Sequence, residues 1–488
     1  MLEKSLSRIR QSNSLTELHE SVRQGIPSAI FGVPDSFKDY IVSTFDIPVL
    51  YVVKDGVTAR HAVEQITQFC GKKTVYIPPK DEILLSLKAF SKDGFYQRLT
   101  ALSALKDAQV IVSTLEALLQ TAPSKIETLT FVKGQDYEIE KAVRKLVEMG
   151  YQRKERCDTK ATFSVRGDIL DVYSIDAPNP CRIDFFGDTV DSIRIYDAEN
   201  TKTIEYVEQT TILQAVEFIL SAQEKNQIKN VLLEELKQAK GDKKIRLKVR
   251  YDDFLLAMEN GNDDELSTIS TICPSVKNTL DLLSENTVVV FNEGKRIYEN
   301  CILYEKEFNE RFAMLLDDGE VFEITKNNLL SIEEAKQKLM RFKEVGLQTL
   351  SSINPFFNPL KIINPTVSAV SNYQLAFKEV FTDIDNWLRS NYSVLVCAMD
   401  DKKADRFCLE LSDKGIASSI DKIGNFTGVN IITERLRQGF IFHEEKIVVI
   451  GSGNLFTKPP VQKKLKSKKQ GFLTLQKWAI TAFTKSTV

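Results

Sequence analysis

The stretch Ser28-Ala-Ile-Phe-Gly32-Val-Pro-Asp-Ser-Phe37-Lys38-Asp39 leads from a short apolar segment through a loop into a helical pattern. Residues 28–33 predict a buried strand, and residues 35–45 predict the helix that follows it. A strand, a loop and a helix in this order form the opening unit of a parallel α/β sheet. This stretch therefore sets the fold class of the first part of the chain.

The same alternation continues on both sides of this stretch. Ser14-Leu-Thr-Glu17 has the spacing of a capping box, and it predicts a helix that Gly25 ends. Further strands are expected at residues 48–53, 73–77 and 109–114, with helices at 57–70 and around 97–106. Apolar β-branched runs between helices indicate a sheet that is covered on both faces.

The loop at residues 32–39 has the place and the length of the phosphate-binding pattern G-x-x-x-x-G-K-[ST]. Gly32 and Lys38 match the pattern, but Phe37 stands at the second glycine and Asp39 stands at the hydroxyl position. A ring at position 37 obstructs the approach of backbone N–H groups to a phosphate, and a carboxylate at position 39 repels it. Gly32 and Lys38 could also match by chance. Either interpretation predicts that this loop does not bind ATP productively.

The sequence offers little material for catalysis or for metal binding. Asn292 and Glu293 follow an expected strand at residues 287–291, and the asparagine stands where an aspartate would organise Mg²⁺. The chain has only three histidines, and its seven cysteines form no C-x-x-C pair. We therefore predict no catalytic residues, no metal site and no cofactor, with reduced cysteines in a cytoplasmic protein.

Composition and charge limit the classes of protein to consider. The 488 residues carry 65 Lys+Arg against 67 Asp+Glu, a net charge of −2, which argues against coating of nucleic acid by electrostatics alone. A hydrophobic fraction of 43% is typical of an ordinary globular protein, and the length allows about three or four domains. We find no apolar run of membrane-spanning length and no signal peptide, so no membrane association is expected.

We predict an α/β multidomain chain in which a degenerate P-loop NTPase-like parallel sheet domain carries an α+β insert and is followed by a further α/β domain. The insert is indicated by dense short strands and turns between residues 163 and 196. A helix is expected at residues 331–343, and strands of the last domain at 393–398, 429–433 and 446–450, with a helix at 402–414. The expected parts are 1–120 and 213–345 for the sheet domain, 121–212 for the insert, 350–455 for an α/β domain of unknown role, 456–470 for a basic linker and 471–488 for a tail.

Two segments of the insert carry a family resemblance. They are Thr162-Phe-Ser-Val-Arg166-Gly-Asp-Ile-Leu-Asp-Val172, and Asn179-Pro-Cys-Arg182-Ile-Asp-Phe-Phe186-Gly-Asp188 with Asp191-Ser-Ile-Arg194. Supporting matches are Tyr76-Ile-Pro-Pro79, Gln97-Arg-Leu99 and Glu116-Ala-Leu-Leu-Gln120. With these motifs the chain resembles the bacterial transcription-repair coupling factors and, more distantly, the excision-repair protein UvrB. The resemblance covers residues 1 to about 470.

The resemblance implies a function and a set of site residues. In the intact family, the protein displaces RNA polymerase stalled at DNA damage and recruits UvrA for nucleotide excision repair. The UvrB-like domain has lost its ATPase motifs, and the insert binds UvrA through positions that fall on Arg166, Arg182 and Phe186 here. Two arginines beside an aromatic residue form a typical interface hot spot. The alternatives are solvated strand arginines and a core aromatic, and only one of Phe185 and Phe186 should lie in the core.

The family's ATP- and Mg²⁺-dependent motor, which acts on DNA, has no counterpart in this sequence. The residues from Phe472 onward depart from the pattern expected for the RNA-polymerase-binding domain, and a shifted reading frame can restore it. We therefore expect a frameshift near residues 470–475 and a poorly ordered tail. We expect this chain at most to bind UvrA. The alternatives are a nucleotide-dependent helicase or ATPase, and a nonspecific DNA-binding protein that uses the lysines at 463–469.

Overall fold

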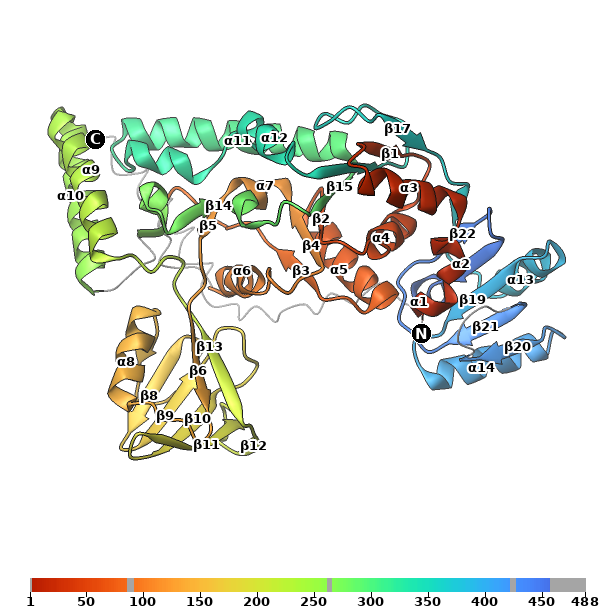
Figure 1. The fold of residues 1–488 in the computed structure, drawn as a ribbon, viewed down its shortest axis with the longest axis horizontal. Coiled ribbons are helices and arrows are strands. Elements are labelled where there is room, and N and C mark those ends of the chain that lie inside the picture. Colours follow the sequence, from red (N-terminus) through yellow and green to blue (C-terminus); the bar gives the residue numbers. More distant parts are fainter. Residues whose placement is uncertain (1, 86–91, 261–265, 422–426, 457–488) are drawn as a thin grey trace, which may run out of the picture.

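The computed structural model describes residues 2–85, 92–260, 266–421 and 427–456. Figure 1 shows an elongated molecule in which a central sheet domain carries the insert on one side and a smaller α/β unit at one end. The expected linker at 456–470 lies outside the described residues except for Phe456. The expected tail at 471–488 lies wholly outside them.

A seven-stranded sheet forms the centre of the first domain, and all its neighbouring strands are parallel. The strand order is β17-β1-β16-β15-β2-β4-β3, which confirms the predicted parallel α/β class. The carboxyl ends of β1, β16 and β15 are therefore neighbours at one edge. The strands are β1 (Ser28–Ile30), β2 (Val49–Val53), β3 (Thr74–Ile77), β4 (Val110–Thr114), β15 (Val288–Asn292), β16 (Lys343–Leu347) and β17 (Lys361–Ile363).

Alternating strand residues divide the core of this domain into two apolar clusters. Tyr51 points into the cluster under the helices nearest the amino end, whereas Leu50 and Val52 point into the opposite cluster. The first group of helices is α1 (Leu2–Ser5), α2 (Ser7–Arg10), α3 (Asn13–Arg23), α4 (Asp35–Ser43) and α5 (Gly56–Cys70). The opposite group is α6 (Asp93–Ser103), α7 (Leu115–Leu119), α11 (Gly294–Asp317) and α12 (Ile332–Leu339).

The capping box predicted at residues 14–17 is wrong. The N-cap of helix α3 is Ser12, two residues before Ser14, and its side chain accepts from the Leu15 amide at 3.5 Å. Both serines stand before the same apolar pattern, so the local sequence does not distinguish them. The helix expected at 331–343 does form a capping box, between Ser331 and Glu334, and it ends at Leu339.

The insert is a six-stranded sheet of order β12-β11-β10-β9-β8-β7, covered by helix α8 (Ile139–Glu148). Two antiparallel strands, β6 (Thr128–Val132) and β13 (Gln209–Leu213), connect it to the central domain (Figure 1). Strand β5 (Thr121–Pro123) pairs with β14 (Val276–Asn278) of the central domain. The sheet strands are β7 (Gln152–Arg153), β8 (Thr162–Arg166), β9 (Ile169–Tyr173), β10 (Cys181–Phe186), β11 (Thr189–Tyr196) and β12 (Thr203–Tyr206).

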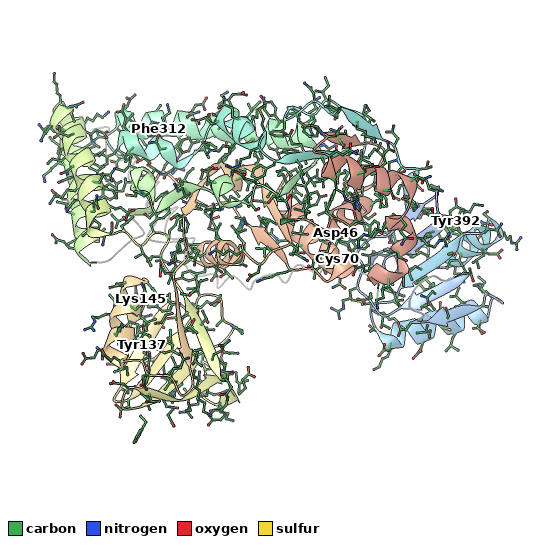
Figure 2. All side chains as sticks on the ribbon, viewed as in Figure 1. Asp46, Cys70, Tyr137, Lys145, Phe312 and Tyr392 are labelled. Atoms are coloured by element: carbon green, nitrogen blue, oxygen red, sulfur yellow. The ribbon has the colours of Figure 1, made fainter. Side chains whose placement is uncertain are left out.

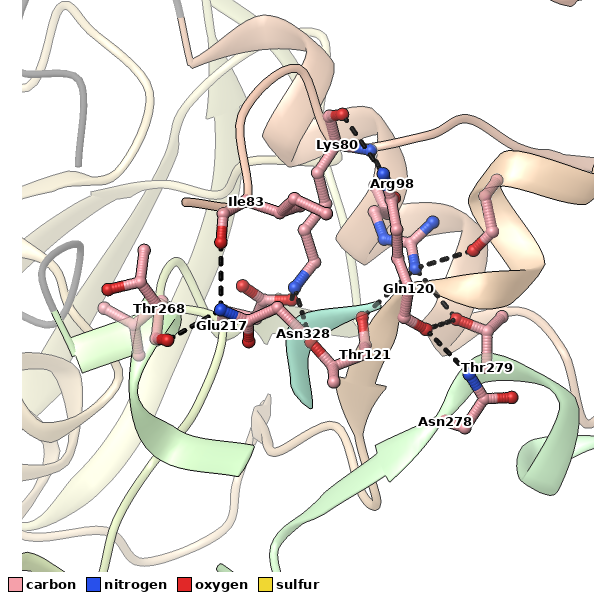
Figure 3. Close-up of polar contacts among 12 residues, drawn as sticks. Lys80, Ile83, Arg98, Gln120, Thr121, Glu217, Thr268, Asn278, Thr279 and Asn328 are labelled. Carbon is pink, nitrogen blue, oxygen red and sulfur yellow. Dashed lines mark hydrogen bonds and ion pairs between the residues drawn. The ribbon is translucent and has the colours of Figure 1, made fainter. Parts of the chain in front are cut away.

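A buried polar cluster fixes the chain where it returns from the insert (Figure 3). Lys80 and Glu217 form an ion pair of 2.6 Å, with side chains only 10% and 6% exposed. Arg98 lies beside them and donates to the carbonyls of Pro78, Ala117 and Thr121. Because Glu217 follows β13, this pair ties the base of the insert to the central domain.

A helical hairpin of α9 (Ala222–Gln238) and α10 (Gly241–Asn260) forms the other end of the molecule (Figure 1). The capping box of Ser221 and Glu224 starts α9, and Gly241 follows with a φ of +59° at the start of α10. The short 3₁₀ helices are η1 (Leu266–Thr268), η2 (Ser270–Ile272), η3 (Thr279–Leu282) and η4 (Glu323–Asn328).

The last unit is a second α/β sheet of order β18-β22-β23-β19-β21-β20, parallel from β23 to β20 and antiparallel at β18 and β22. Because β17 pairs with β1, the first sheet extends to Ile363, past the expected start of this unit at residue 350. Figure 2 places Tyr392 here, far from Tyr137 and Lys145 of the insert. Its elements are β18 (Val367–Ala369), β19 (Ser393–Cys397), β20 (Ser418–Ile420), β21 (Val429–Ile432), β22 (Phe440–Phe442), β23 (Ile447–Ile450), α13 (Glu379–Arg389), α14 (Asp401–Ser412) and α15 (Ser452–Leu455).

Candidate functional site

The degenerate phosphate loop, residues 32–39, lies at the carboxyl edge of the central sheet between β1 and α4. Gly32 has a φ of +75°, a conformation that glycine adopts readily. Lys38 in the first turns of α4 is fully buried. Its Nζ donates to Asp35 Oδ1 at 2.9 Å, Asn292 Oδ1 at 3.2 Å, Glu293 Oε1 at 2.5 Å and Thr349 Oγ1 at 3.0 Å. The ammonium that would hold a phosphate is thus surrounded by acceptors from this chain.

Asn292 and Glu293, the residues expected at the disabled acidic motif, lie directly at this lysine. The Thr349 amide also donates to Glu293 Oε1, at 2.8 Å. Burial acts to raise the pKa of Glu293, but the bonds from Lys38 and from the Thr349 amide outweigh it and hold the pKa below its usual range. Glu293 is therefore an ionised partner of Lys38.

Asp39 faces the protein interior. Burial raises its pKa to about 7, against the opposing effect of a hydrogen bond with the Tyr51 hydroxyl. Asn292 Nδ2 donates to the same hydroxyl at 2.8 Å. A chain of hydrogen bonds therefore connects Asp39 with the environment of Lys38.

Phe37, at the position of the second glycine, holds the last unit against the central domain. Its ring is fully buried and lies 4.9 Å from the ring of Phe440 and 5.4 Å from that of Phe442, between centroids. The neighbouring Ser36 hydroxyl donates to the carbonyl of Gly439 at 2.8 Å. The side chain that is incompatible with a phosphate loop is thus part of a core shared by two units.

A cavity of about 470 Å³ adjoins the loop. Its lining includes Asp35, Lys54, Asn292, Glu293, Lys295 and Thr349. Lys38 is not part of the lining, because its ammonium lies behind Glu293 and Thr349. Within the described ranges, no group of three or more His, Cys, Asp or Glu side chains is arranged to hold a metal ion.

The insert presents a second candidate site on the open face of its sheet. Strand pairing aligns Ser164, Asp171, Arg182 and Arg194 in one row across β8 to β11, while the alternate residues enter the core. Ser164 and Asp171 are buried, so the partly exposed members of this row are the two arginines. Phe185 is 7% exposed and belongs to that core, whereas Phe186 is 84% exposed. The prediction that only one of these two phenylalanines is a core residue is therefore confirmed.

The three residues predicted to bind UvrA lie on this face but differ in the contacts and the exposure of their side chains. Arg166 is exposed and donates from Nη2 to the carbonyl of Glu155 at 2.6 Å. Arg182 forms a bidentate pair with Asp171, Nε–Oδ1 at 2.6 Å and Nη2–Oδ2 at 2.8 Å, and its guanidinium lies 5.2 Å from the centroid of the Tyr196 ring. Arg182 is therefore held in place before any partner binds, whereas the Phe186 side chain is 84% exposed.

Sequence reasoning missed several residues of both sites. Asp171 belongs to the sequence motif, but its pairing with Arg182 follows only from the strand register. Arg194 lies opposite Tyr206, which is 68% exposed and extends the open face at the edge strand. Thr349 comes from the loop after β16, and the sequence contains no local signal that brings it to Lys38.

Together, these features define a class of protein. It is a P-loop-like α/β domain in which side chains of the same chain surround the lysine of the phosphate loop, and it carries an inserted sheet domain. Residues 129–218 of that insert match the family described as the UvrB interaction domain.

The chain is related over most of its length to transcription-repair-coupling factors, as its sequence motifs predict. It is 24% identical over 473 residues to the one from Bacillus subtilis, covering 93% of this chain and 40% of that protein. It is 25% identical over 340 residues to one from Staphylococcus epidermidis, covering 68% of this chain and 29% of the relative. The chain thus spans about two fifths of the first relative and less of the second.

A solved structure of S. tokodaii Xpd4 matches with 12% identity and a TM-score of 0.23, covering 87% of this chain and 80% of that one. Among the described residues, no helix combines the length and the apolar character that a membrane crossing requires.

Proposed function

We propose that this chain is a docking module of the transcription-repair-coupling type, which binds UvrA through the open face of its insert. The observation that carries the proposal is Phe186, an aromatic side chain that is 84% exposed within the segment that matches the UvrB interaction domain. Exposed aromatic residues beside arginines are typical anchors of protein interfaces. The proposal is limited to docking and does not include displacement of RNA polymerase or DNA translocation.

The arrangement of the arginines supports a binding role for this face. Arg182 is held by Asp171 and Tyr196, so little conformational entropy is lost when a partner contacts it. Arg166 supplies an exposed charge at the end of β8. The surface therefore combines a rigid polar centre with an accessible apolar anchor.

The geometry of the phosphate loop favours docking over nucleotide chemistry. Lys38 already has four acceptors, and Phe37 lies in the core between two units. A triphosphate would have to displace Glu293 from a buried ion pair and approach past a loop without its second glycine. We accordingly propose that the chain uses no ATP at this site.

The experiment is a titration of UvrA with the chain by isothermal calorimetry, comparing Phe186→Ser with the unaltered sequence. We expect the substitution to weaken binding by about 2 kcal/mol or more, roughly 30-fold in Kd. Because the ring is exposed, the unfolding midpoint should not fall. Leu409→Ser is the matched control, since Leu409 is 67% exposed on α14 of the last unit.

Arg166→Glu is the second variant, because Arg182→Glu would place a new carboxylate against Asp171 and disturb the sheet itself. We expect Arg166→Glu to weaken UvrA binding while the insert stays folded. Unchanged affinity for both Phe186→Ser and Arg166→Glu would refute the proposed surface.

A further inference from the structure

Glu293 combines an unusual backbone with an unusual side-chain position. Its φ and ψ are +61° and +59°, in the left-handed region that glutamate rarely adopts. It precedes α11, yet its side chain does not cap that helix. A non-glycine residue held in this conformation indicates that the surroundings require its side chain at this place.

The carboxylate of Glu293 accepts from the same two kinds of donor that a phosphate takes in a working loop. One is the ammonium of Lys38 at 2.5 Å, and the other is a backbone amide, that of Thr349, at 2.8 Å. The group lies at the carboxyl edge of β1, β15 and β16, where ligands of parallel α/β sheets bind.

We propose that the Glu293 carboxylate is a built-in oxyanion in the phosphate position of the degenerate loop, and that the place it occupies is a latent site for diphosphate-type anions. The chain thereby keeps the ends of β1, β15 and β16 together without a nucleotide. This inference is independent of UvrA docking, because it concerns a different domain.

The surroundings allow an external anion once the carboxylate is removed. The cavity of about 470 Å³ reaches Glu293, and its lining has three cationic groups, Lys54, Lys295 and Arg296, against two other carboxylates, Asp35 and Glu299. Lys38 would then lose its closest anionic partner and keep only Asp35, at 2.9 Å, as an ion-pair partner. A buried ammonium that has lost such a partner favours an incoming anion.

The test measures binding of inorganic pyrophosphate to the full chain by calorimetry. Glu293→Gly removes the carboxylate and suits the left-handed backbone, and Glu293→Gln removes the charge but keeps the shape. We expect either variant to bind pyrophosphate at least about ten-fold more tightly than the unaltered chain. Adding Lys38→Met should abolish this gain. Glu299→Gln is the matched control, because Glu299 lines the same cavity but its carboxylate lies 3.9 Å from Lys295.

A second measurement covers the case in which Glu293→Gly does not fold. Acetic anhydride labelling followed by mass spectrometry should find Lys38 protected in the unaltered chain and labelled about ten-fold faster in Glu293→Gln. A gain in pyrophosphate affinity that survives Lys38→Met would overturn the proposal. So would folded variants that show neither tighter binding nor faster labelling.

Discussion

Replacing Phe37 by alanine should uncouple the last unit from the central domain. The ring is fully buried, and its ring neighbours are Phe440, Phe442 and Tyr40 at 4.9, 5.4 and 5.7 Å. Truncation of a buried phenylalanine costs about 3–5 kcal/mol. Each aromatic pair contributes about 0.5–1.5 kcal/mol beyond its buried area. Since two of the three neighbours belong to the last unit, we expect a loss of about 4 kcal/mol, mostly in the coupling between the units.

Urea unfolding followed by two probes can separate these effects. The chain has two tryptophans, and Trp387 lies on α13 of the last unit, so its fluorescence reports on that unit in a Trp478→Phe background. Far-UV circular dichroism reports on the whole chain. We expect coincident transitions before the change and separate transitions in Phe37→Ala.

Phe312→Ala is the control for general loss of core packing. Phe312 is buried on α11 in the opposite apolar cluster, away from the last unit (Figure 2). It should lower stability by a similar amount without separating the two transitions. If Phe37→Ala keeps the transitions coincident and costs less than about 1 kcal/mol, the role given to Phe37 is refuted.

Three further substitutions test other parts of the structure by urea unfolding. Burial raises the pKa of Asp39 to about 7. The ionised carboxylate therefore destabilises the folded state increasingly as the pH rises from about 4 to about 7. Asp39→Asn should stabilise the protein more at pH 8 than at pH 5, by about 2–4 kcal/mol. An equal effect at both pH values would contradict this. Glu217→Leu leaves the Lys80 ammonium buried without its carboxylate and should cost about 3–5 kcal/mol, most of which Lys80→Met in the same chain should recover. Gly439→Ala should cost more than about 2 kcal/mol, since its new Cβ would lie 1.8 Å from the Val449 carbonyl oxygen; a neutral result would show that β22 is placed differently.

The central sheet could be predicted because its strands are short apolar runs that helices separate. The observed strand ends differ from the predicted ends by only a few residues, as in the strand expected at 28–33 and observed as Ser28–Ile30. The start of α3 was misassigned because Ser12 and Ser14 offer nearly equivalent caps, and only the hydrogen bond to Leu15 decides between them. Local patterns thus predict the elements but choose poorly between neighbouring caps.

The two sites could be predicted as positions but not as contacts. The loop pattern singles out Phe37, Lys38, Asn292 and Glu293, because each departs from or matches a known spacing. Their partners lie far away in sequence: Lys38 and Glu293 are separated by 255 positions, and Phe37 contacts Phe440, which belongs to a strand of the other large α/β sheet. The pairing of Arg182 with Asp171 likewise depends on the register of β9 and β10, which no local signal fixes.

The pairing of β6 with β13 should allow the insert to be moved into another protein as one continuous segment. Thr128 lies opposite Leu213 in this antiparallel pair, so the chain enters and leaves the insert at adjacent points. A segment whose two ends meet in this way can be joined to another protein through a single surface loop, because such a graft imposes little strain on either partner. Residues 128–213 supply most of the apolar core between α8 and the six-stranded sheet, and Leu99 and Ala215 complete it from outside the segment. A graft that replaces these two contacts would carry the face with Phe186 onto a new scaffold.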